Sequence, residues 1–368
     1  MKIELESKSP LFIGSGYEYL GNEIKKEKHF LYRVSIKEIL KKMPKSQLLE
    51  FILHENYENL ENEIQNLKNK YYSECCVYKM ELKNDFLALT PNKKIKEFIK
   101  INRMPFIPGS TIKGYIRTAL MWNLLRHDEE KLSSTLTIIR KKIYRAKKIS
   151  EVIVPEIDKL LEFKKLSEKR DPKNDFMKFL QITDFVPSGS DTYNIFLDEI
   201  KITYVNNPSK IKRSFLAELV EGTFYGEISL SPSFFNSLKR NPDLRIFVSK
   251  LLDIDIFDDE KYLNEEVETL ILEKIFRICD DFTMTMVKNS KIKKEKYLIR
   301  IGAYTGIFYK TILSLIKEND EKLFENMRKK FWKKSLNSPN FPKTLKLTSD
   351  NNELGWCVAQ ITSHYSQN

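Results

Sequence analysis

Cysteine and histidine are scarce in this sequence of 368 residues. The four cysteines are Cys75, Cys76, Cys279 and Cys357, and the four histidines are His29, His54, His127 and His364. The chain contains no Cys-x-x-Cys pair, whereas a structural zinc site needs ligands at close and regular spacing. No zinc framework is visible, and we expect the protein to work without a metal ion or another cofactor.

Long apolar runs are also missing. No stretch approaches the ~20 apolar residues that cross a membrane. The residues after Met1 alternate between polar and apolar, which is typical of a half-buried strand and not of a signal peptide. We expect a cytoplasmic protein with no membrane-spanning segment.

Acidic residues are outnumbered: 51 Asp and Glu face 63 Lys and Arg, which gives a formal net charge of +12. This surplus favours a polyanionic partner, either nucleic acid or an anionic membrane surface. The abundance of Lys, Asn and Ile leaves a genome-wide composition bias as an alternative. The strongest basic run, residues 140–148, is either a solvated helix face or a contact with nucleic-acid backbone.

The most informative segment, residues 104–126, begins with proline and glycine and continues as an amphipathic helix. Ser110 or Thr111 is placed to cap this helix, which we expect to run to about Arg126. Apolar residues recur every four positions and predict a buried face, formed by Ile112, Ile116, Leu120 and Leu124.

Two cations, Lys113 and Arg117, are also four residues apart and share a face in the first turns of this helix. The free N–H groups of a helix start attract anions, so the segment predicts a phosphate-binding site. An ordinary helix cap with solvated charges explains the same pattern equally well. A nucleotide P-loop does not fit, because that motif needs Gly before the Lys and Ser or Thr after it.

Two further glycine segments are present. Gly14 and Gly16 lie near the start of the chain, and glycine permits close approach of the backbone to another group. The late glycine loop, residues 302–306, follows a strand-like run and is expected to turn into a helix that carries Tyr309 and Lys310. Two predicted helix starts with cations nearby strengthen the phosphate interpretation.

The remaining pattern predicts an α+β fold. Residues 37–99 are interpreted as a helical insertion, residues 217–230 as strand, tight turn and strand, and residues 242–286 as helical. We expect residues 1–235 to form a core that the insertion interrupts. Residues 236–368 are expected to complete that core with helices and strands and to carry the late glycine loop.

Residues 107–120 (IPGSTIKGYIRTAL) resemble the helix-opening motif of the RAMP superfamily of CRISPR RNA-binding proteins. Other segments resemble the subunit family that caps the backbone filament of type III-A (Csm) effector complexes, namely residues 9–16, 179–184, 300–306 and 310–311. Together these segments cover nearly the whole chain, and the combination is more specific than the first motif alone.

The resemblance implies a ferredoxin-like (RRM-like) core whose glycine loops and helix starts contact RNA. It implies a non-catalytic subunit at the 3′ end of the guide RNA, stacked on the last copy of the repeating backbone subunit. Such a subunit is needed for maturation of the guide 3′ end in antiviral defence. Target RNA, the small subunit of the complex and host nucleases are further candidate partners.

Cations bind the phosphates of single-stranded RNA and aromatic rings lie under its bases. We expect RNA to be bound by Gly14, Gly16, Gly109, Ser110, Lys113, Arg117, Arg300, Tyr304 and Lys310. Tyr17 is either a stacking platform or a packed tyrosine. The chain departs from the family pattern at Ala303 and Tyr304, where a second glycine is expected, and this departure concerns the backbone path of the late loop.

The main rival hypothesis is a metal-independent endoribonuclease that processes CRISPR transcripts, as some RAMP proteins do. It needs a general acid or base, and His29 is the only histidine near the early glycine segment. A metal-dependent nuclease needs converging carboxylates, whereas Glu18, Glu23 and Asp184 are scattered in the sequence. A protein–protein adaptor that does not touch RNA is the third hypothesis.

Overall fold

The computed structural model describes residues 1–83, 89–153, 159–163, 171–254, 265–287, 297–333, 336 and 340–362. Its strands are β1 (Lys2–Ser7), β2 (Gly14–Leu20), β3 (Ile24–Glu27), β4 (Phe30–Val34), β5 (Cys76–Leu82), β6 (Lys94–Phe98), β7 (Lys100–Ile101), β8 (Met104–Pro105), β9 (Leu180–Ile182), β10 (Tyr193–Tyr204), β11 (Asn207–Leu230), β12 (Tyr297–Arg300), β13 (Thr344–Leu347) and β14 (Trp356–Thr362). Its α-helices are α1 (Ile36–Leu40), α2 (Lys45–Leu53), α3 (Tyr57–Tyr71), α4 (Gly109–His127), α5 (Glu129–Ile143), α7 (Pro232–Arg240), α8 (Pro242–Leu252), α9 (Glu265–Met284), α10 (Leu313–Asn319) and α11 (Glu321–Phe331).

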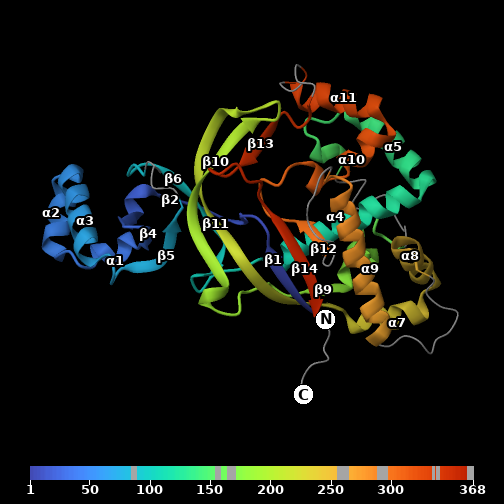
Figure 1. Ribbon diagram of the computed structural model, residues 1–368, viewed down its shortest axis with the longest axis horizontal. Helices are drawn as coiled ribbons and strands as arrows, with labels where there is room; N and C mark the ends of the chain where they lie inside the picture. The colour runs from blue at the N-terminus through green and yellow to red at the C-terminus, as the bar shows by residue number, and fades with distance from the viewer. Residues whose placement is uncertain are drawn as a thin grey trace.

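A mixed sheet of twelve described strands organises the molecule, in the order β12-β14-β1-β11-β10-β5-β4-β3 along its main path. The central strand, β11, pairs antiparallel with β1, β9 and β10 and parallel with β6. Figure 1 shows β10 and β11 as a long, curved hairpin, with α4 and α9 on one side of it and the α1–α3 lobe on the other. The expected α+β class is confirmed. No described helix is both long and apolar enough to cross a membrane.

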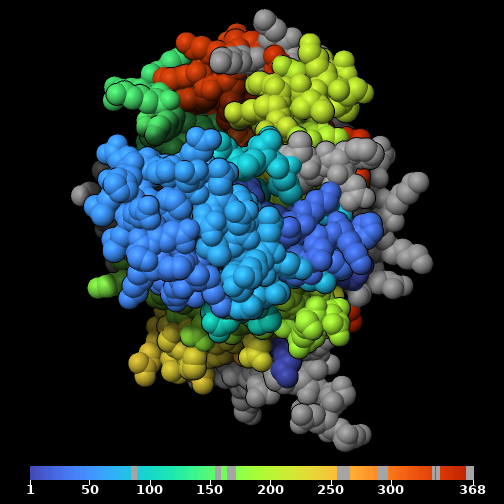
Figure 2. Space-filling view, turned by 90° about the vertical axis from the view of Figure 1, so that its left-hand side faces the viewer, coloured from blue at the N-terminus to red at the C-terminus, as the bar shows by residue number. Residues whose placement is uncertain are grey.

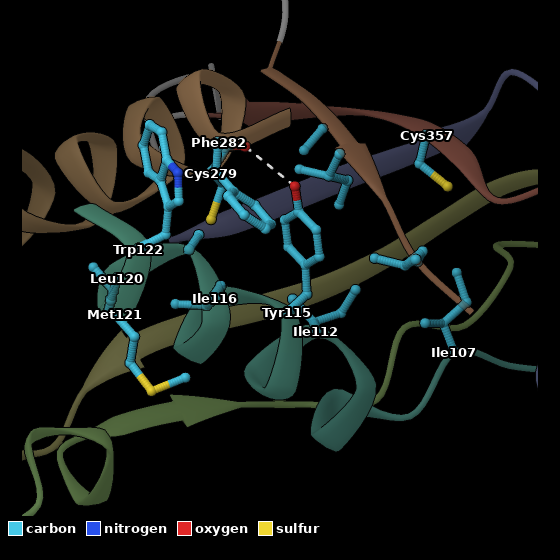
Figure 3. Packing of buried hydrophobic residues seen from close by; sticks show 14 of the residues in the cluster. Ile107, Ile112, Tyr115, Ile116, Leu120, Met121, Trp122, Cys279, Phe282 and Cys357 are labelled. Atoms are coloured by element: carbon cyan, nitrogen blue, oxygen red, sulfur yellow. Dashed lines mark hydrogen bonds between the residues drawn. The ribbon is translucent and has the colours of Figure 1, made fainter. Parts of the chain in front are cut away.

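The core beside the sheet is built around α4, which packs against α9 (Figure 3). The Phe282 ring lies 5.9 Å from the Tyr115 ring and 5.6 Å from the Trp122 ring. The Tyr115 hydroxyl donates to the Cys279 carbonyl oxygen at 3.2 Å. The predicted buried face of α4 is confirmed, since none of its four residues is more than 1% exposed: Ile112, Ile116, Leu120 and Leu124.

The turn expected within residues 217–230 does not exist, because β11 is unbroken. Its two glycines serve close contacts instead. A Cβ on Gly222, whose φ is +153°, would lie 2.4 Å from the Thr192 carbonyl oxygen, and a Cβ on Gly226 would lie 2.6 Å from the Phe185 ring. The prediction was wrong because a glycine that allows tertiary contact looks, in sequence, like one that allows a turn.

The expected insertion is helical only as far as Tyr71, where α3 ends. Strands β5 and β6 follow, and they join the main sheet through β10 and β11. Figure 2 shows α1–α3 covering the middle of one face of the molecule. Lys68 attaches α3 to the sheet side by donating to the carbonyl oxygens of Asn22 at 2.8 Å and Ile24 at 3.2 Å. The proposed domain boundaries stay a prediction.

A buried carboxylate, Glu218 of β11, links β2, β5 and the chain around β6 to the central strand. The hydroxyls of Tyr19 and Tyr78 donate to Glu218 Oε1, each at 2.6 Å, and the Phe98 N–H donates to Oε2 at 3.0 Å. Lys100 forms an ion pair with the same oxygen. Burial, followed by the charge of Glu218, raises the pKa of both tyrosines, so both remain donors. These four donors replace the hydration that the carboxylate loses.

Replacing Glu218 by alanine removes the acceptor of all four donors and leaves the Lys100 ammonium buried without its counter-ion. Breaking a buried pair costs about 3–5 kcal/mol, so we expect the urea midpoint of the Glu218→Ala protein to fall sharply. Glu227→Ala is the matched control, because Glu227 lies on the same strand but is exposed. It should change the free energy of unfolding by at most about 0.5 kcal/mol. Equal losses for both variants would contradict the assignment.

Candidate nucleic-acid interface

The start of α4, the early glycine segment and the late glycine loop meet at one place. A pocket of about 370 Å³, here called the central pocket, is lined by Gly14, Ser110, Arg300 and Lys310, among others. These four are among the nine residues that the sequence predicts to bind RNA. Segments almost 300 residues apart in the chain thus form one surface.

Two neighbouring pockets extend this surface. The α4 pocket, of about 320 Å³, shares Ser110 and Gly114 with the central pocket and adds Lys113, Arg117 and Lys178. The aromatic pocket, of about 890 Å³, lies on the other side and shares two lining residues with the central pocket, namely Arg300 and Tyr309. The three pockets adjoin one another at these shared residues and are here together called the interface track.

The first turn of α4 is capped differently from the prediction. Neither Ser110 nor Thr111 caps it, because the N-cap residue is Pro108, which makes no side-chain cap bond. Instead the Asp184 carboxylate accepts the Gly109 N–H at 2.8 Å. One of the N–H groups that we expected to bind a phosphate therefore already donates to a carboxylate from a distant segment.

Lys113 and Arg117 do share one face of α4, but both have partners within the chain. The Lys113 ammonium donates to the Leu180 carbonyl oxygen at 2.7 Å, and Arg117 forms an ion pair with the buried Asp175 at 2.8 Å. Partial burial lowers the pKa of Lys113, and the neighbouring Arg117 lowers it further while Asp175 raises it. Removing Arg117 would leave the Asp175 carboxylate buried without this partner, so Lys113 is the cleaner residue for testing phosphate contact.

Arg300 is largely buried and forms part of the wall between two pockets. Its guanidinium lies 4.5 Å from the ring centres of both Tyr309 and Trp356. It donates from Nε to the Leu354 carbonyl oxygen at 3.0 Å and pairs with Glu353 at 3.0 Å. These contacts hold Arg300 between Tyr309 and residues 353–356, and its side chain also lines two pockets.

The late loop takes a path that depends on left-handed backbone. Gly302 (φ +88°), Tyr304 (φ +70°) and Gly306 (φ +101°) all adopt this conformation. Position 304 is thus a tyrosine with a backbone conformation that favours glycine. The Tyr304 ring stacks on Phe12 with centres 5.3 Å apart, which holds the loop against the early segment. The Ala303 N–H adds a 2.7 Å bond to the Phe12 carbonyl oxygen.

No long helix starts directly after this loop, contrary to the expectation. Residues Phe308–Lys310 form a single 3-10 turn, and the following helix, α10, begins at Leu313, whose side chain is buried. The second predicted helix-start phosphate site is therefore absent from this part of the described chain. The cation Lys310 is present all the same and lines the central pocket.

Lys310 and Lys346 line the track, and the pKa of each lysine is lowered. Partial enclosure by the pocket walls lowers the pKa of Lys310, and the charges of Lys346 and Arg300 lower it further. Burial likewise lowers the pKa of Lys346, followed by the charges of Arg213 and Lys96. Cations that repel one another in this way favour an anionic ligand.

The early segment is only partly on the track. Gly14 lines the central pocket, whereas Gly16 (φ +85°) lines none of the three pockets. Tyr17 is 55% exposed, so it is not a packed tyrosine. Its N–H donates to the Ser15 hydroxyl at 3.1 Å.

The residues of the two nuclease hypotheses lie apart. His29 lies in the exposed turn between β3 and β4 and lines none of the three pockets. Glu18 pairs with Lys96 at 3.2 Å, Glu23 pairs with Arg33 at 2.8 Å, and Asp184 caps α4. The described residues hold no cluster of three or more His, Cys, Asp or Glu side chains suited to a metal ion.

Known proteins resemble this chain over almost its whole length. The model of the RAMP superfamily matches residues 4–337. The chain belongs to the RAMP superfamily. A Csm5 protein of a CRISPR system in Methanocaldococcus jannaschii is 24% identical to it over 404 aligned positions, covering 97% of this chain and 88% of that protein.

Two solved structures resemble this RAMP protein in fold. One is a chain of a Csm–crRNA–target RNA ternary complex of a type III-A CRISPR-Cas system, with a TM-score of 0.69 and 22% identity, covering 98% of this chain and all of that chain. The other is Csm5 of T. onnurineus, with a TM-score of 0.60 and 19% identity, covering 96% and 99% of the two chains. Both likenesses extend over nearly the whole chain.

Several residues that line the track were not predicted from the sequence. Lys178, Lys346 and Trp332 line its pockets, but each lies in a segment without a glycine motif. Residues 140–148 are the strongest basic run of the sequence, yet six of them line a separate pocket of about 860 Å³. A charge count finds runs of cations, whereas the track collects single lysines from distant segments of this RAMP protein.

Two glycines at the start of α4 should respond oppositely to alanine. A Cβ on Gly109 would lie 2.5 Å from the Ile182 carbonyl oxygen and 2.6 Å from that of Thr183, whereas a Cβ on Gly114 would meet nothing within 4 Å. We expect Gly114→Ala to raise the free energy of unfolding by about 0.5–1 kcal/mol. Gly109→Ala should lower it, because backbone must move. Urea unfolding measures both, and a stabilising Gly109→Ala would contradict this packing.

Proposed function

We propose that this RAMP protein is a non-catalytic, RNA-binding subunit of a type III-A CRISPR (Csm) effector complex. It caps the backbone of repeating subunits at the 3′ end of the guide RNA and serves the maturation of that end in antiviral defence. The observation that carries the proposal is the interface track, where glycine segments from three parts of the chain form one cation-rich surface.

The proposal is supported by chemistry and by likeness. Single-stranded RNA is held by cations on phosphates, by close backbone approach and by rings under bases, and the track offers all three. The similar protein of M. jannaschii is described as Csm5, and the similar chain of the ternary complex belongs to an assembly with crRNA and target RNA. Residues 1–235 and 236–368 would share a ferredoxin-like core in this proposal.

The partners follow from the same proposal. They are the guide RNA, target RNA, the repeating backbone subunit and the small subunit, with host nucleases that trim the guide as further partners in the cytoplasm. Seven of the nine residues predicted from the sequence line the track and form the proposed RNA site, whereas Gly16 and Gly109 line none of its three pockets. Lys113 and Lys310 are proposed to bind phosphate directly, whereas Arg117 and Arg300 are proposed to hold the walls through their carboxylate partners.

RNA binding across a salt series tests the proposal. Replacing both Lys113 and Lys310 by glutamine removes two phosphate contacts, so the slope of log K against log salt for single-stranded RNA should fall by about 1.4. The affinity should fall with it, measured by fluorescence anisotropy of a labelled oligonucleotide. The matched control is Lys45→Gln on α2, an exposed lysine away from the track, which should leave the slope unchanged.

The outcomes separate the hypotheses. Equal slopes for the wild type and the double variant would show that Lys113 and Lys310 do not contact phosphate. Any RNA binding would then take place elsewhere on the surface. A wild-type protein that binds no RNA would favour the adaptor hypothesis. Arg117→Ala is a poor test here, because it also breaks the ion pair to buried Asp175 and destabilises the fold.

The enzyme hypothesis has its own test. Repeat RNA incubated with the purified protein should remain uncut, with and without divalent metal, when separated on a denaturing gel. His29→Ala should leave RNA binding unchanged, because His29 lies in the β3–β4 turn outside the track. Cleavage by the wild type that the His29→Ala variant loses would replace the binding proposal by an endoribonuclease.

A further inference from the structure

The aromatic pocket is the largest of the three on the interface track. It lies between the late glycine loop, the end of α11 and the start of β13, and its volume of about 890 Å³ falls within the range of about 300–1,000 Å³ that is typical of ligand sites. Figure 1 shows β13 beside β10, and α11 in the upper part of the molecule. The nine predicted RNA contacts include only two of its lining residues, Arg300 and Tyr304.

The charge of this pocket is one-sided. Its described lining holds six cations, Lys212, Arg300, Lys330, Lys333, Lys343 and Lys346, and one carboxylate, Glu353. That carboxylate already pairs with Arg300 at 3.0 Å. Cations therefore outnumber carboxylates in the described lining, and the pocket favours a ligand with more than one negative charge.

The other wall of the pocket is aromatic. The rings of Trp332 and Phe341 lie 4.9 Å apart, and the Phe308 ring lies 5.8 Å from Phe341. Trp332 and Phe341 pack against the hydrophobic core and remain partly exposed. Partly exposed rings next to cations are the combination that binds single-stranded nucleic acid. An acidic peptide would use the cations and leave the rings unmatched.

The pocket also adjoins the proposed RNA path. Arg300 and Tyr309 line both it and the central pocket, and Lys310 stands on the central side of that shared wall. A strand whose phosphates follow the central pocket can therefore place its next nucleotide in the aromatic pocket without leaving the surface.

We propose that the aromatic pocket holds an unstacked nucleotide of single-stranded RNA, with its base against Trp332 and Phe341 and its phosphate at Lys346. The proposal rests on the proposed RNA-binding function and adds a base-binding subsite to it. The contact is to the face of the base, so it does not depend on which base is bound.

Tryptophan fluorescence of the full chain tests this subsite. Oligoadenylate should quench the fluorescence of the wild type, because a stacked base quenches Trp332, and Trp332→Phe should lose that quenching while still binding. A ribose-phosphate strand of the same length without bases should bind to the protein but should not quench its fluorescence. Trp332→Leu removes the ring and should weaken oligoadenylate about 5–150-fold, while leaving the baseless strand unchanged.

The measurements distinguish an error in the proposed base-binding subsite from an error in the proposed RNA-binding function. If the wild type binds oligoadenylate, but Trp332→Phe keeps the quenching or Trp332→Leu keeps the affinity, the subsite is wrong and the RNA-binding function stands. If the wild type binds neither strand, both fail. A polyglutamate peptide that quenches Trp332 and displaces the RNA would assign the pocket to an acidic protein segment instead.

A second variant covers the case in which Trp332→Leu does not fold. Lys346→Gln alters a partly exposed side chain of β13 and should lower the salt slope for RNA by about 0.7. It should also reduce the quenching at a fixed RNA concentration. Unchanged slope and quenching in Lys346→Gln would overturn the subsite, and Lys45→Gln again serves as the control.

Discussion

The buried Glu218 carboxylate is the constraint on which the sheet depends. It lies in β11, which pairs with four other strands, and it accepts donors from β2, β5 and the chain around β6. A buried carboxylate must keep all its donors, so these segments cannot shift independently of β11. One of them, β2, begins at Gly14, and the Ile99 N–H donates to the adjacent Ile13 carbonyl oxygen at 2.8 Å. Contacts within the sheet therefore fix the position of Gly14, which lines the central pocket.

Arginine and lysine have different tasks along the interface track. Arg117 and Arg300 hold carboxylates at 2.8 and 3.0 Å, and their planar guanidinium groups tie separate segments together. For Lys310 and Lys346 the described residues provide no carboxylate partner, and partial burial together with neighbouring cations lowers the pKa of each. The arginines therefore build the walls, and the lysines carry the charge that a polyanion can neutralise.

Sequence patterns predicted the features that depend on residues close to one another in the chain. The four-residue period of α4 identified its buried face, and the glycine, proline and cation clusters identified the segments that meet at the track. The patterns did not show which groups are already satisfied. Asp184, which caps Gly109, is 75 residues away in sequence, and Asp175, which pairs with Arg117, is 58 residues away. No spacing rule relates such partners, because only the tertiary fold brings them together.

The two glycines at the start of α4 show how the site differs from its scaffold. Gly109 is required by the chain itself, since the Ile182 and Thr183 carbonyl oxygens leave no room for a Cβ. Around Gly114 the described residues leave that space open, although a glycine inside a helix costs about 0.5–1 kcal/mol relative to alanine. Packing within the described chain therefore does not explain Gly114. It lies with Ser110 on the wall shared by the central and α4 pockets, so the missing methyl group widens the path between them. Gly114 therefore belongs to the proposed interface together with the lysines.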